Sequence, residues 1–254
     1  SLRSEATVIV PTLLKYTAPR AHRDGALARV AAVLGAAPAR ATREAPLARL
    51  VDHSRDPLRT LAASIECELF GAHWDDAWRD AGDTDRALAT VRAYLGERGP
   101  HDQPLRALEQ VTFRFEVRCD YGAWRDLQRH RMVAATTPRL DTREGWWLSP
   151  ELDELGFLPD ARAALERAAE VHAKLAPDNP WEAQYAVPLA YRVRYVMQAS
   201  LRELFHFVEL RSARQGHESY RRVAQALADG LLSVCPWLGE FLRVDRQHYP
   251  FARH

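Results

Sequence analysis

The stretch "VTFRFEVRCDYGAWRDLQRHR", residues 111–131, decides the fold, because a strand pattern passes directly into a helix pattern. Apolar side chains take every second position from Val111 to Cys119, and polar or charged side chains take the positions between them. This alternation is typical of a strand with one buried face and one solvated face. Residues 121–131 then place aromatic and leucine side chains at helical spacing and end on the cationic triplet 129–131. We therefore expect a strand followed by a helix with a charged end.

Most of the remaining chain has the pattern of helices, so the predicted fold class is α+β, rich in helix and poor in strands. The segment 7–17 contains Pro11 and is compatible with a short strand or a helix end. Pro188 is expected to kink or break the helix that contains it. The periodic segments predicted as helices are 57–72, 84–96, 159–176, 180–199, 200–213 and 217–242.

Composition excludes several classes of protein. The chain has 254 residues, 47% of them hydrophobic and 27% charged, which is typical of a globular protein. A formal net charge of +1 argues against binding a nucleic acid polymer. No apolar run is long enough to cross a membrane, and no signal peptide is visible. The three cysteines (Cys67, Cys119 and Cys235) are far apart, so we expect a reducing, cytoplasmic location.

Two segments rich in turn-forming residues organise the chain. Residues 34–48 contain two prolines and many small side chains, and they read as a linker. Residues 97–104 form a second loop signal. We expect an N-terminal extension and linker over residues 1–45 and a single domain over residues 46–254.

The triplet Arg129-His130-Arg131 has two readings from its residue types alone. Cations are favoured at a helix C-terminus by the helix dipole, so the triplet is either a solvated helix end or an anion-binding element. Arg202 and Arg211 are further anion-binding candidates. The alternative interpretation is that each forms an ion pair with a neighbouring glutamate. No catalytic group can be named.

A metal site is not predicted. His206 and Glu209 lie three residues apart, but no third ligand occurs at a suitable spacing. The pair is therefore more typical of a helix contact. P-loop, dinucleotide-binding and nucleophile-elbow motifs do not occur in the sequence.

Two separated blocks resemble the flavin-dependent thymidylate synthase (ThyX) family. The first is "TFRFEVRCDYGAWRDLQRHR", 112–131, and the second is "ASLRELFHFVELRSARQGHESYRRVAQAL", 199–227. They are similar to the family's strand, helix and RHRxxSxNExSxRY signature and to its later NxRxLxxFxxLR helix. The resemblance covers roughly residues 46–245 and implies a helix-rich α+β fold with a small antiparallel sheet flanked by helices.

The resemblance also implies a chemistry. Family members are homotetramers that hold FAD at subunit interfaces, and they convert dUMP to dTMP with methylenetetrahydrofolate and NADPH. The flavin carries the difficult step, which agrees with the general division of labour between cofactor and protein. The resemblance implies a small-molecule substrate such as a nucleotide, and it implies neither a nucleic acid polymer nor a membrane as partner.

Site residues are carried over position by position. The resemblance implies that Arg129, His130, Arg131, Arg202 and Ser200 bind the cofactor. It implies that the substrate contacts Arg211, Gln184, Asp126 and Arg139. Pro188, Glu109, Phe113 and Phe115 also match family positions.

The sequence departs from the family pattern at the nucleotide-binding positions. The signature Ser, Asn and Glu are Ala134, Thr136 and Thr137, and the second Ser is Arg139. This chain has Asp126 where the family has a Gln, Asp141-Thr142 where it has Arg-Tyr, and Ser200 where it has an Asn. It has Gln184 where the family has an Arg that helps to hold the nucleotide. The segment "QPLRALEQ" (103–110) stands where the family has an element with two histidines. Each lost charge-assisted contact costs about 1.5–3 kcal/mol, so we expect weak dUMP binding.

Three functions remain open. The first is FAD-dependent one-carbon transfer to an acceptor other than dUMP. The second is a non-catalytic domain that keeps the fold for oligomerisation or for support of an active copy. The third is dTMP synthesis with an altered pocket. The pattern also resembles the second copy of tandem ThyX-like proteins, in which a partner domain supplies the missing residues.

Overall fold

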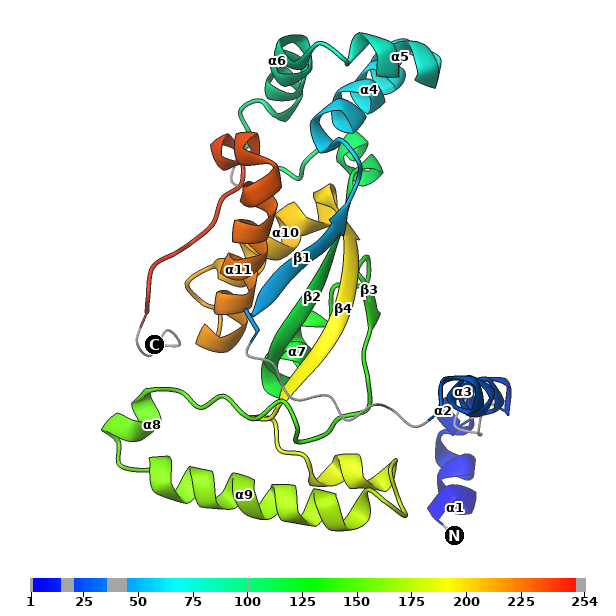
Figure 1. Cartoon of the computed structure of the whole chain (residues 1–254), viewed down its shortest axis with the longest axis vertical. Helices are drawn as coiled ribbons and strands as arrows, with labels where there is room; N and C mark the ends of the chain where they lie inside the picture. The colour runs from blue at the N-terminus through cyan, green and yellow to red at the C-terminus, as the bar shows by residue number, and fades with distance from the viewer. Residues whose placement is uncertain (1, 15–20, 36–44, 100, 250–254) are drawn as a thin grey trace. The chain divides into compact units, whose positions relative to one another are not determined.

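The computed structural model describes residues 2–14, 21–35, 45–99 and 101–249 (Figure 1). The chain divides into two compact units, Ser1–Arg43 and Glu44–His254. The described part of the first unit is mostly helical, and the segment for which a strand or helix end was expected contains the end of one helix at Ile9 and a short second helix from Pro11 to Leu14. Its residues 15–17 lie outside the described residues. The helices of this unit are α1 (Leu2–Ile9), α2 (Pro11–Leu14) and α3 (Ala21–Leu34).

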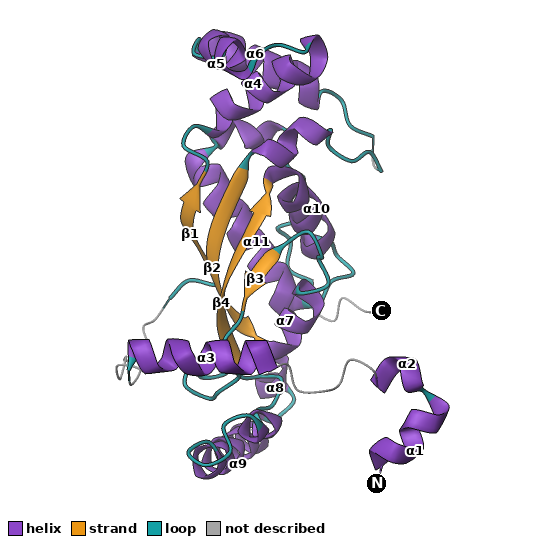
Figure 2. Cartoon of the chain, turned by 90° about the vertical axis from the view of Figure 1, so that its right-hand side faces the viewer, coloured by secondary structure: helices purple, strands orange, loops and turns teal. Residues whose placement is uncertain are grey.

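The second unit is built on an antiparallel sheet of four strands, which confirms the predicted α+β class (Figure 2). The spatial order is β1-β2-β4-β3, so the two long strands β2 and β4 form the centre. The strands are β1 (Ala48–His53), β2 (Thr112–Asp120), β3 (Ala134–Thr136) and β4 (Arg192–Ser200).

The predicted strand is confirmed as β2, and its alternation matches its burial. Phe113, Phe115 and Val117 are at most 1% exposed, while the charged residues between them are half-buried. Phe115 lies opposite Met197 of β4, so the apolar faces of both central strands meet the same core.

The expected helix over 180–199 is wrong. Only the 3₁₀ turn η2 (Glu182–Ala186) is helical, and the chain then enters β4. Every second side chain from Tyr191 to Ala199 is buried, which is the period of a strand and not that of a helix. Pro188 precedes this switch and disfavours a continuous helix.

Three helices pack against one face of the sheet (Figures 1 and 2). Their apolar stripes contain Leu204, Phe205, Leu227 and Leu231, all fully buried. The last helix is shorter than the expected 217–242 because the chain turns at Pro236, which starts the 3₁₀ turn η3 (Pro236–Glu240). The three helices are α7 (Tyr121–Leu127), α10 (Leu201–Ser212) and α11 (Glu218–Val234).

A helical group covers one end of the sheet. Asp56 caps its first helix by accepting from Arg59 N–H at 3.1 Å, and Gly71 ends that helix at a φ of 64°. Asp83 caps the third helix by accepting from the N–H groups of Asp85 and Arg86. The helices are α4 (Pro57–Phe70), α5 (Trp74–Asp80) and α6 (Thr84–Leu95), with the 3₁₀ turn η1 (Arg106–Gln110) after them.

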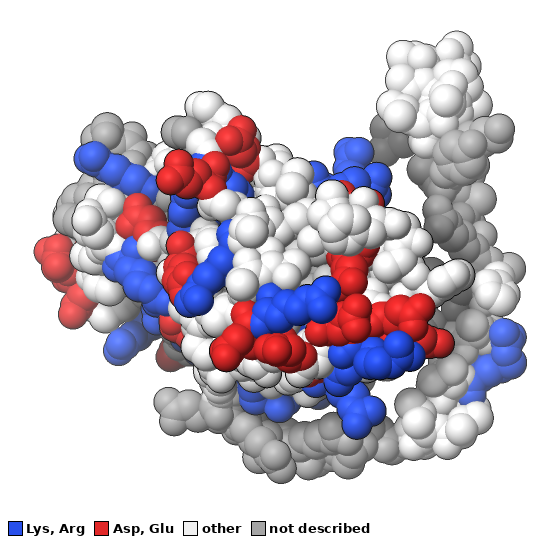
Figure 3. Space-filling model, turned by 90° about the horizontal axis from the view of Figure 1, so that it is seen from above, with Lys and Arg blue, Asp and Glu red and all other residues white. Residues whose placement is uncertain are grey.

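Charges of both signs are interspersed on the surface of this end (Figure 3). Described ion pairs join α6 to its neighbours: Arg86 pairs with Glu66 of α4 at 3.4 Å and with Asp80 of α5 at 4.0 Å, and Arg92 pairs with Glu240 of η3 at 2.6 Å. The pair Arg79–Asp76, at 2.9 Å, lies within α5.

The opposite end of the sheet carries α8 (Glu151–Glu154) and α9 (Leu158–Leu175). Tyr191, at the start of β4, is 1% exposed and its hydroxyl donates to the Leu165 carbonyl at 2.8 Å. This bond fixes α9 to the sheet. Among the described helices, none combines the length and the apolar character that a membrane span requires.

Candidate functional site

His130, the middle residue of the triplet, is buried, with an exposed fraction of 7%. It does not lie on a helix, because α7 ends at Leu127 and the triplet occupies the turn that follows. Its ring packs on Phe207 of α10 with the centroids 4.4 Å apart. The histidine is therefore part of the contact between this turn and α10.

Both ring nitrogens of His130 have partners that define the tautomer. Arg211 Nε, which always carries a hydrogen, donates to His130 Nε2 at 3.0 Å. His130 Nδ1 lies 2.7 Å from Glu203 Oε1. Because Nε2 accepts, the hydrogen of the neutral ring is on Nδ1 and is donated to the Glu203 carboxylate.

Arg211 connects this histidine to the end of α7. Its Nη2 donates to the Asp126 carbonyl at 2.9 Å, and its guanidinium lies 5.5 Å from the centre of the Tyr220 ring. Three predicted site residues, His130, Arg211 and Asp126, are thus brought together. We call His130, Glu203 and Arg211 the histidine cluster.

Glu203 was not predicted as a site residue, although the sequence carried a signal for it. Ser200 and Glu203 have the spacing of a helix capping box, and Ser200 Oγ accepts from Glu203 N–H at 3.3 Å. Ser200, expected at the cofactor, is therefore the cap of α10. The Glu203 side chain binds His130 across 73 residues of sequence, which local spacing cannot reveal.

Arg202 points away from the histidine cluster and has partners of its own. Its Nε donates to the Pro104 carbonyl at 2.8 Å, and its Nη1 donates to Glu109 at 3.0 Å. Glu109 also pairs with Arg106, whose hydrogen bond is the main cause of a lowered Glu109 pKa. Arg202 is thus ion-paired, but with Glu109, 93 residues away along the chain, and not with the neighbouring glutamate that the alternative reading expected.

Gln184 and Arg139 form a third group. Gln184 Oε1 accepts from Leu140 N–H at 3.0 Å, and its amide donates to the Trp181 carbonyl at 3.2 Å. The guanidinium of Arg139 lies 5.2 Å from the centre of the Trp181 ring. Gln184 therefore holds the loop that follows β3 and is not bonded to the histidine cluster.

The two arginines of the triplet face solvent. The side chain of Arg129 is 73% exposed and reaches Asp126 at 3.4 Å. Arg131 is exposed, and no ion pair involving it occurs within the described ranges. These two guanidiniums are available to a ligand or a partner, whereas His130 is not.

The suggested His206–Glu209 pair is not a metal site in this structure. Glu209 accepts from Arg98 Nη2 at 2.5 Å and from Arg243 N–H at 3.2 Å. Across the described part of the chain, no group of three or more His, Cys, Asp or Glu side chains is arranged to hold a metal ion.

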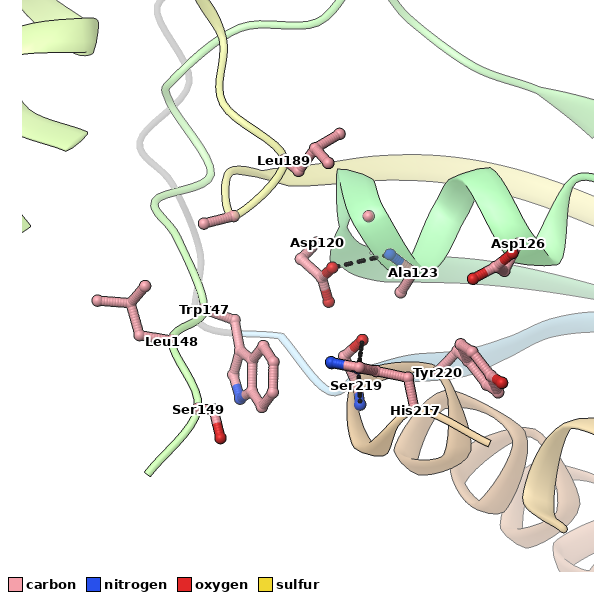
Figure 4. A pocket seen from close by; sticks show the side chains of 12 residues that line it. Asp120, Ala123, Asp126, Trp147, Leu148, Ser149, Leu189, His217, Ser219 and Tyr220 are labelled. Carbon is pink, nitrogen blue, oxygen red and sulfur yellow. Dashed lines mark hydrogen bonds between the residues drawn. The ribbon is translucent and has the colours of Figure 1, made fainter. Parts of the chain in front are cut away.

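A cavity of about 350 Å³ adjoins the histidine cluster through Asp126 and Tyr220 (Figure 4). Asp120, the cap of α7, lines it and is 8% exposed. Burial raises the pKa of the Asp120 carboxyl, in spite of a 2.8 Å hydrogen bond from Ala123 N–H. This cavity was not predicted from the sequence, in which the placement of Asp120 just before a helix start was the available signal.

The model of the thymidylate synthase complementing protein family, Thy1, matches residues 49–237, which include all four strands except the first residue of β1. The chain belongs to the Thy1 family. The resemblance to flavin-dependent thymidylate synthases seen in the sequence is thereby confirmed.

Curated relatives of this Thy1 chain are longer than the region they share with it. A UPF0159 protein of Chlamydia muridarum is 38% identical over 168 residues, which is 66% of this chain and 32% of the relative. A UPF0159 protein of Chlamydia pneumoniae is 38% identical over 143 residues (56% and 27%), and one of Thermoplasma acidophilum is 36% identical over 151 residues (58% and 30%). The chain spans about a third of the length of these relatives.

Proposed function

We propose that this Thy1 chain is a divergent flavoprotein that takes part in FAD-dependent one-carbon transfer to a nucleotide or related acceptor other than dUMP. The observation that carries the proposal is the RHR triplet inside the matched region, with two exposed guanidiniums on either side of a fixed histidine. Arginine forks of this kind suit the phosphate oxygens of an anionic cofactor.

The described residues fit FAD in part. Arg129 and Arg131 would hold its diphosphate, because both face solvent and carry permanent charge. His130, Ser200 and Arg202 have internal partners, so their role would be to position the turn and the start of α10. When bound, the flavin would supply the redox chemistry of the transfer.

The acceptor is proposed to differ from dUMP because the substrate residues have lost positive charge. Gln184 is neutral and bonded to backbone, and Asp126 adds a carboxylate near the cluster. A nucleotide phosphate needs charge-assisted donors, so these changes weaken its binding. Arg211 keeps its charge but spends two donors inside the protein. Methylenetetrahydrofolate and NADPH are the proposed co-substrates, and no catalytic residue is assigned.

An assembly is part of the proposal. The exposed position of Arg129 and Arg131 suits a cofactor shared between copies, as in a homotetramer, or a site completed by a second ThyX-like domain. The greater length of the relatives supports the second arrangement. The proposed division is an extension and linker over residues 1–45 and a Thy1 domain over residues 46–254, in a cytoplasmic protein.

A second candidate function is non-catalytic support of an active copy. The specific observation in its favour is that three of the five proposed cofactor residues, His130, Ser200 and Arg202, are engaged within the chain. In this case the triplet would be a packing element at an interface.

The test is the absorption spectrum of the purified protein before and after incubation with FAD and desalting, combined with light scattering. A retained flavin band with an oligomeric mass is expected. A colourless monomer after desalting would overturn the flavoprotein proposal, while a colourless oligomer would favour the support function.

A further inference from the structure

Two arginines from different elements adjoin the loop that carries Trp147. The backbone N–H of Arg192, at the start of β4, donates to the Gly145 carbonyl at 2.8 Å. The backbone N–H of Trp147 donates to the Ala190 carbonyl at 2.9 Å, so the loop is bonded to the chain that enters β4. Arg222, near the start of α11, lies over the Trp147 ring at 5.8 Å from its centre. The loop therefore brings Arg192 and Arg222 to the same end of the sheet.

The carboxylates on the neighbouring face of the sheet are shared between arginines. Glu144 accepts from Arg118 Nε and from Arg194 Nη2, both at 2.8 Å. Glu116 lies 3.0 Å from Arg49 and 3.7 Å from Arg194. Because each of these two carboxylates already serves two guanidiniums, neither can balance a further cation.

The guanidiniums of Arg192 and Arg222 form no hydrogen bond and no ion pair with any residue that the structure describes. Burial is the first cause of a lowered Arg192 pKa, and repulsion from Arg118 and Arg222 adds to it. The attraction of Asp120 and Glu144 opposes this shift without cancelling it. Arg192 is half-buried and Arg222 is exposed, so a solute can reach both. Positive charge is therefore in excess at this end of the sheet.

The acidic side chains closest to the two arginines do not remove this excess. The Asp120 carboxylate accepts from Ala123 N–H at 2.8 Å and from the Ser219 hydroxyl, and burial raises its pKa. Glu218 lies one turn before Arg222 on α11 and is exposed, but no described ion pair joins the two. An added anion would thus meet two guanidiniums whose N–H groups are unused.

We propose that Arg192 and Arg222 bind a phosphate group at the start of β4, with the Trp147 indole supporting the Arg222 guanidinium. A phosphate has enough oxygens to accept from two arginine forks at once, and its charge offsets the repulsion between them. A guanidinium that lies over an indole still presents its N–H groups at its edge. Inorganic phosphate and the phosphate of a small ester share this chemistry. The inference does not rest on the proposed flavin chemistry, because neither arginine is among those that would hold FAD.

The test is calorimetry on the full chain without FAD, at low ionic strength, with inorganic phosphate, phenyl phosphate and acetate as probes. Both phosphates are expected to bind, and acetate is expected to bind at least about fivefold more weakly, because its two oxygens cannot fill two forks. Tighter binding of phenyl phosphate than of inorganic phosphate would assign the group to an ester. Equal or weaker binding of phenyl phosphate would assign the site to the free ion.

Two variants locate the binding. Arg222→Gln, at an exposed position, is expected to weaken phosphate binding at least about fivefold without affecting the fold. Arg192→Gln is expected to weaken it by a similar factor, and it should not lower the melting temperature in phosphate-free buffer, because the charge that it removes is repelled by its neighbours. Arg167→Gln, at an exposed arginine of α9, is the matched control and is expected to change nothing.

Four results would overturn the proposal. The first is failure of both phosphates to bind at millimolar concentration, and the second is equal binding of acetate. The third is an equal loss of phosphate binding in Arg167→Gln and Arg222→Gln, which would show that only the net charge matters. The fourth is a lower melting temperature of Arg192→Gln in phosphate-free buffer, which would assign Arg192 to the stability of the fold.

Discussion

His130 donates from Nδ1 to Glu203 at 2.7 Å, and this bond joins the turn after α7 to the first turn of α10. The other ring nitrogen accepts from Arg211, at the last turn of the same helix. One imidazole therefore contacts both ends of α10. The histidine of the triplet is an internal connection between elements, whereas the arginines beside it are exposed to solvent.

Removing either partner of this bond is expected to destabilise the fold. His130→Ala and Glu203→Ala should each lower the free energy of unfolding by about 2–3 kcal/mol, because a buried polar group loses its partner. The double variant should cost little more than one single variant, which denaturant unfolding in a double-mutant cycle measures. Glu170→Ala, at an exposed site of α9, is the control, and strictly additive losses would contradict the coupling.

The exposed arginines are expected to control flavin retention. Arg129→Ala together with Arg131→Ala should lower FAD affinity at least about tenfold, because each removes a charge-assisted donor, with little change in stability. Arg125→Ala, an exposed arginine on α7, is the matched control. Flavin fluorescence titration makes the measurement, and equal losses in the control and the double variant would argue against a specific role.

dUMP is expected to bind weakly. The neutral Gln184 is bonded to Leu140 and Trp181, so it offers no charge to a phosphate. Restoring an arginine, Gln184→Arg, should strengthen dUMP binding by a factor of about ten if the phosphate is held here. Calorimetry checks both statements, and micromolar affinity of the unmodified protein would refute the first.

Glu144 is expected to stabilise the fold in a pH-dependent way. The hydrogen-bonded guanidinium of Arg194, at 2.8 Å, holds the pKa of the Glu144 carboxyl below its usual range, and Arg118 adds to the effect. Glu144→Gln should cost about 1–2 kcal/mol of unfolding free energy at neutral pH.

The sign of this effect follows from the lowered pKa. The contribution of Glu144 is present above the unfolded-chain value of about 4.3 and is lost as the pH falls through the folded value. Unfolding curves of the wild type and Glu144→Gln should therefore converge in acid. Curves that diverge on acidification would contradict the assignment.

Asp120 is expected to have the opposite dependence. Burial raises its pKa, so the folded protein takes up this proton more readily than the unfolded chain does. Stability relative to Asp120→Asn, which does not titrate, should rise as the pH falls through the raised value towards the unfolded value of about 3.9. Denaturation midpoints between neutral pH and pH about 4 make the measurement, and a relative loss of stability in acid would count against a buried carboxylate.

Local patterns predicted the parts of the fold that local physics controls. The alternation of β2 and the apolar stripes of α10 and α11 depend on neighbouring residues, so they were visible in the sequence. β4 was mistaken for a helix because Val196, which is exposed, adds an apolar residue to its polar face and blurs the alternation. β1 was missed because its side chains are largely half-buried or exposed, and its pairing with β2 defines it.

The candidate site was less predictable for a physical reason. The residue types of the triplet suggested anion binding, but burial decides which of the three can reach a ligand. Glu203 removes His130 from the surface, and Glu109 occupies Arg202. Both contacts join segments that are distant along the chain, so spacing alone could not assign them.

The hydrogen bonds of Glu144 to two arginines of the sheet have a consequence for the cavity beside α7. Its carboxylate is bonded to Arg118 of β2 and Arg194 of β4, while its own loop carries Trp147, whose backbone N–H donates to the Ala190 carbonyl at 2.9 Å. The loop that carries Trp147 is thus ordered before any ligand binds, so binding does not include the entropic cost of ordering it. A change that makes the loop more mobile would lower the affinity for a ligand through this entropy, without changing any atom that contacts the ligand.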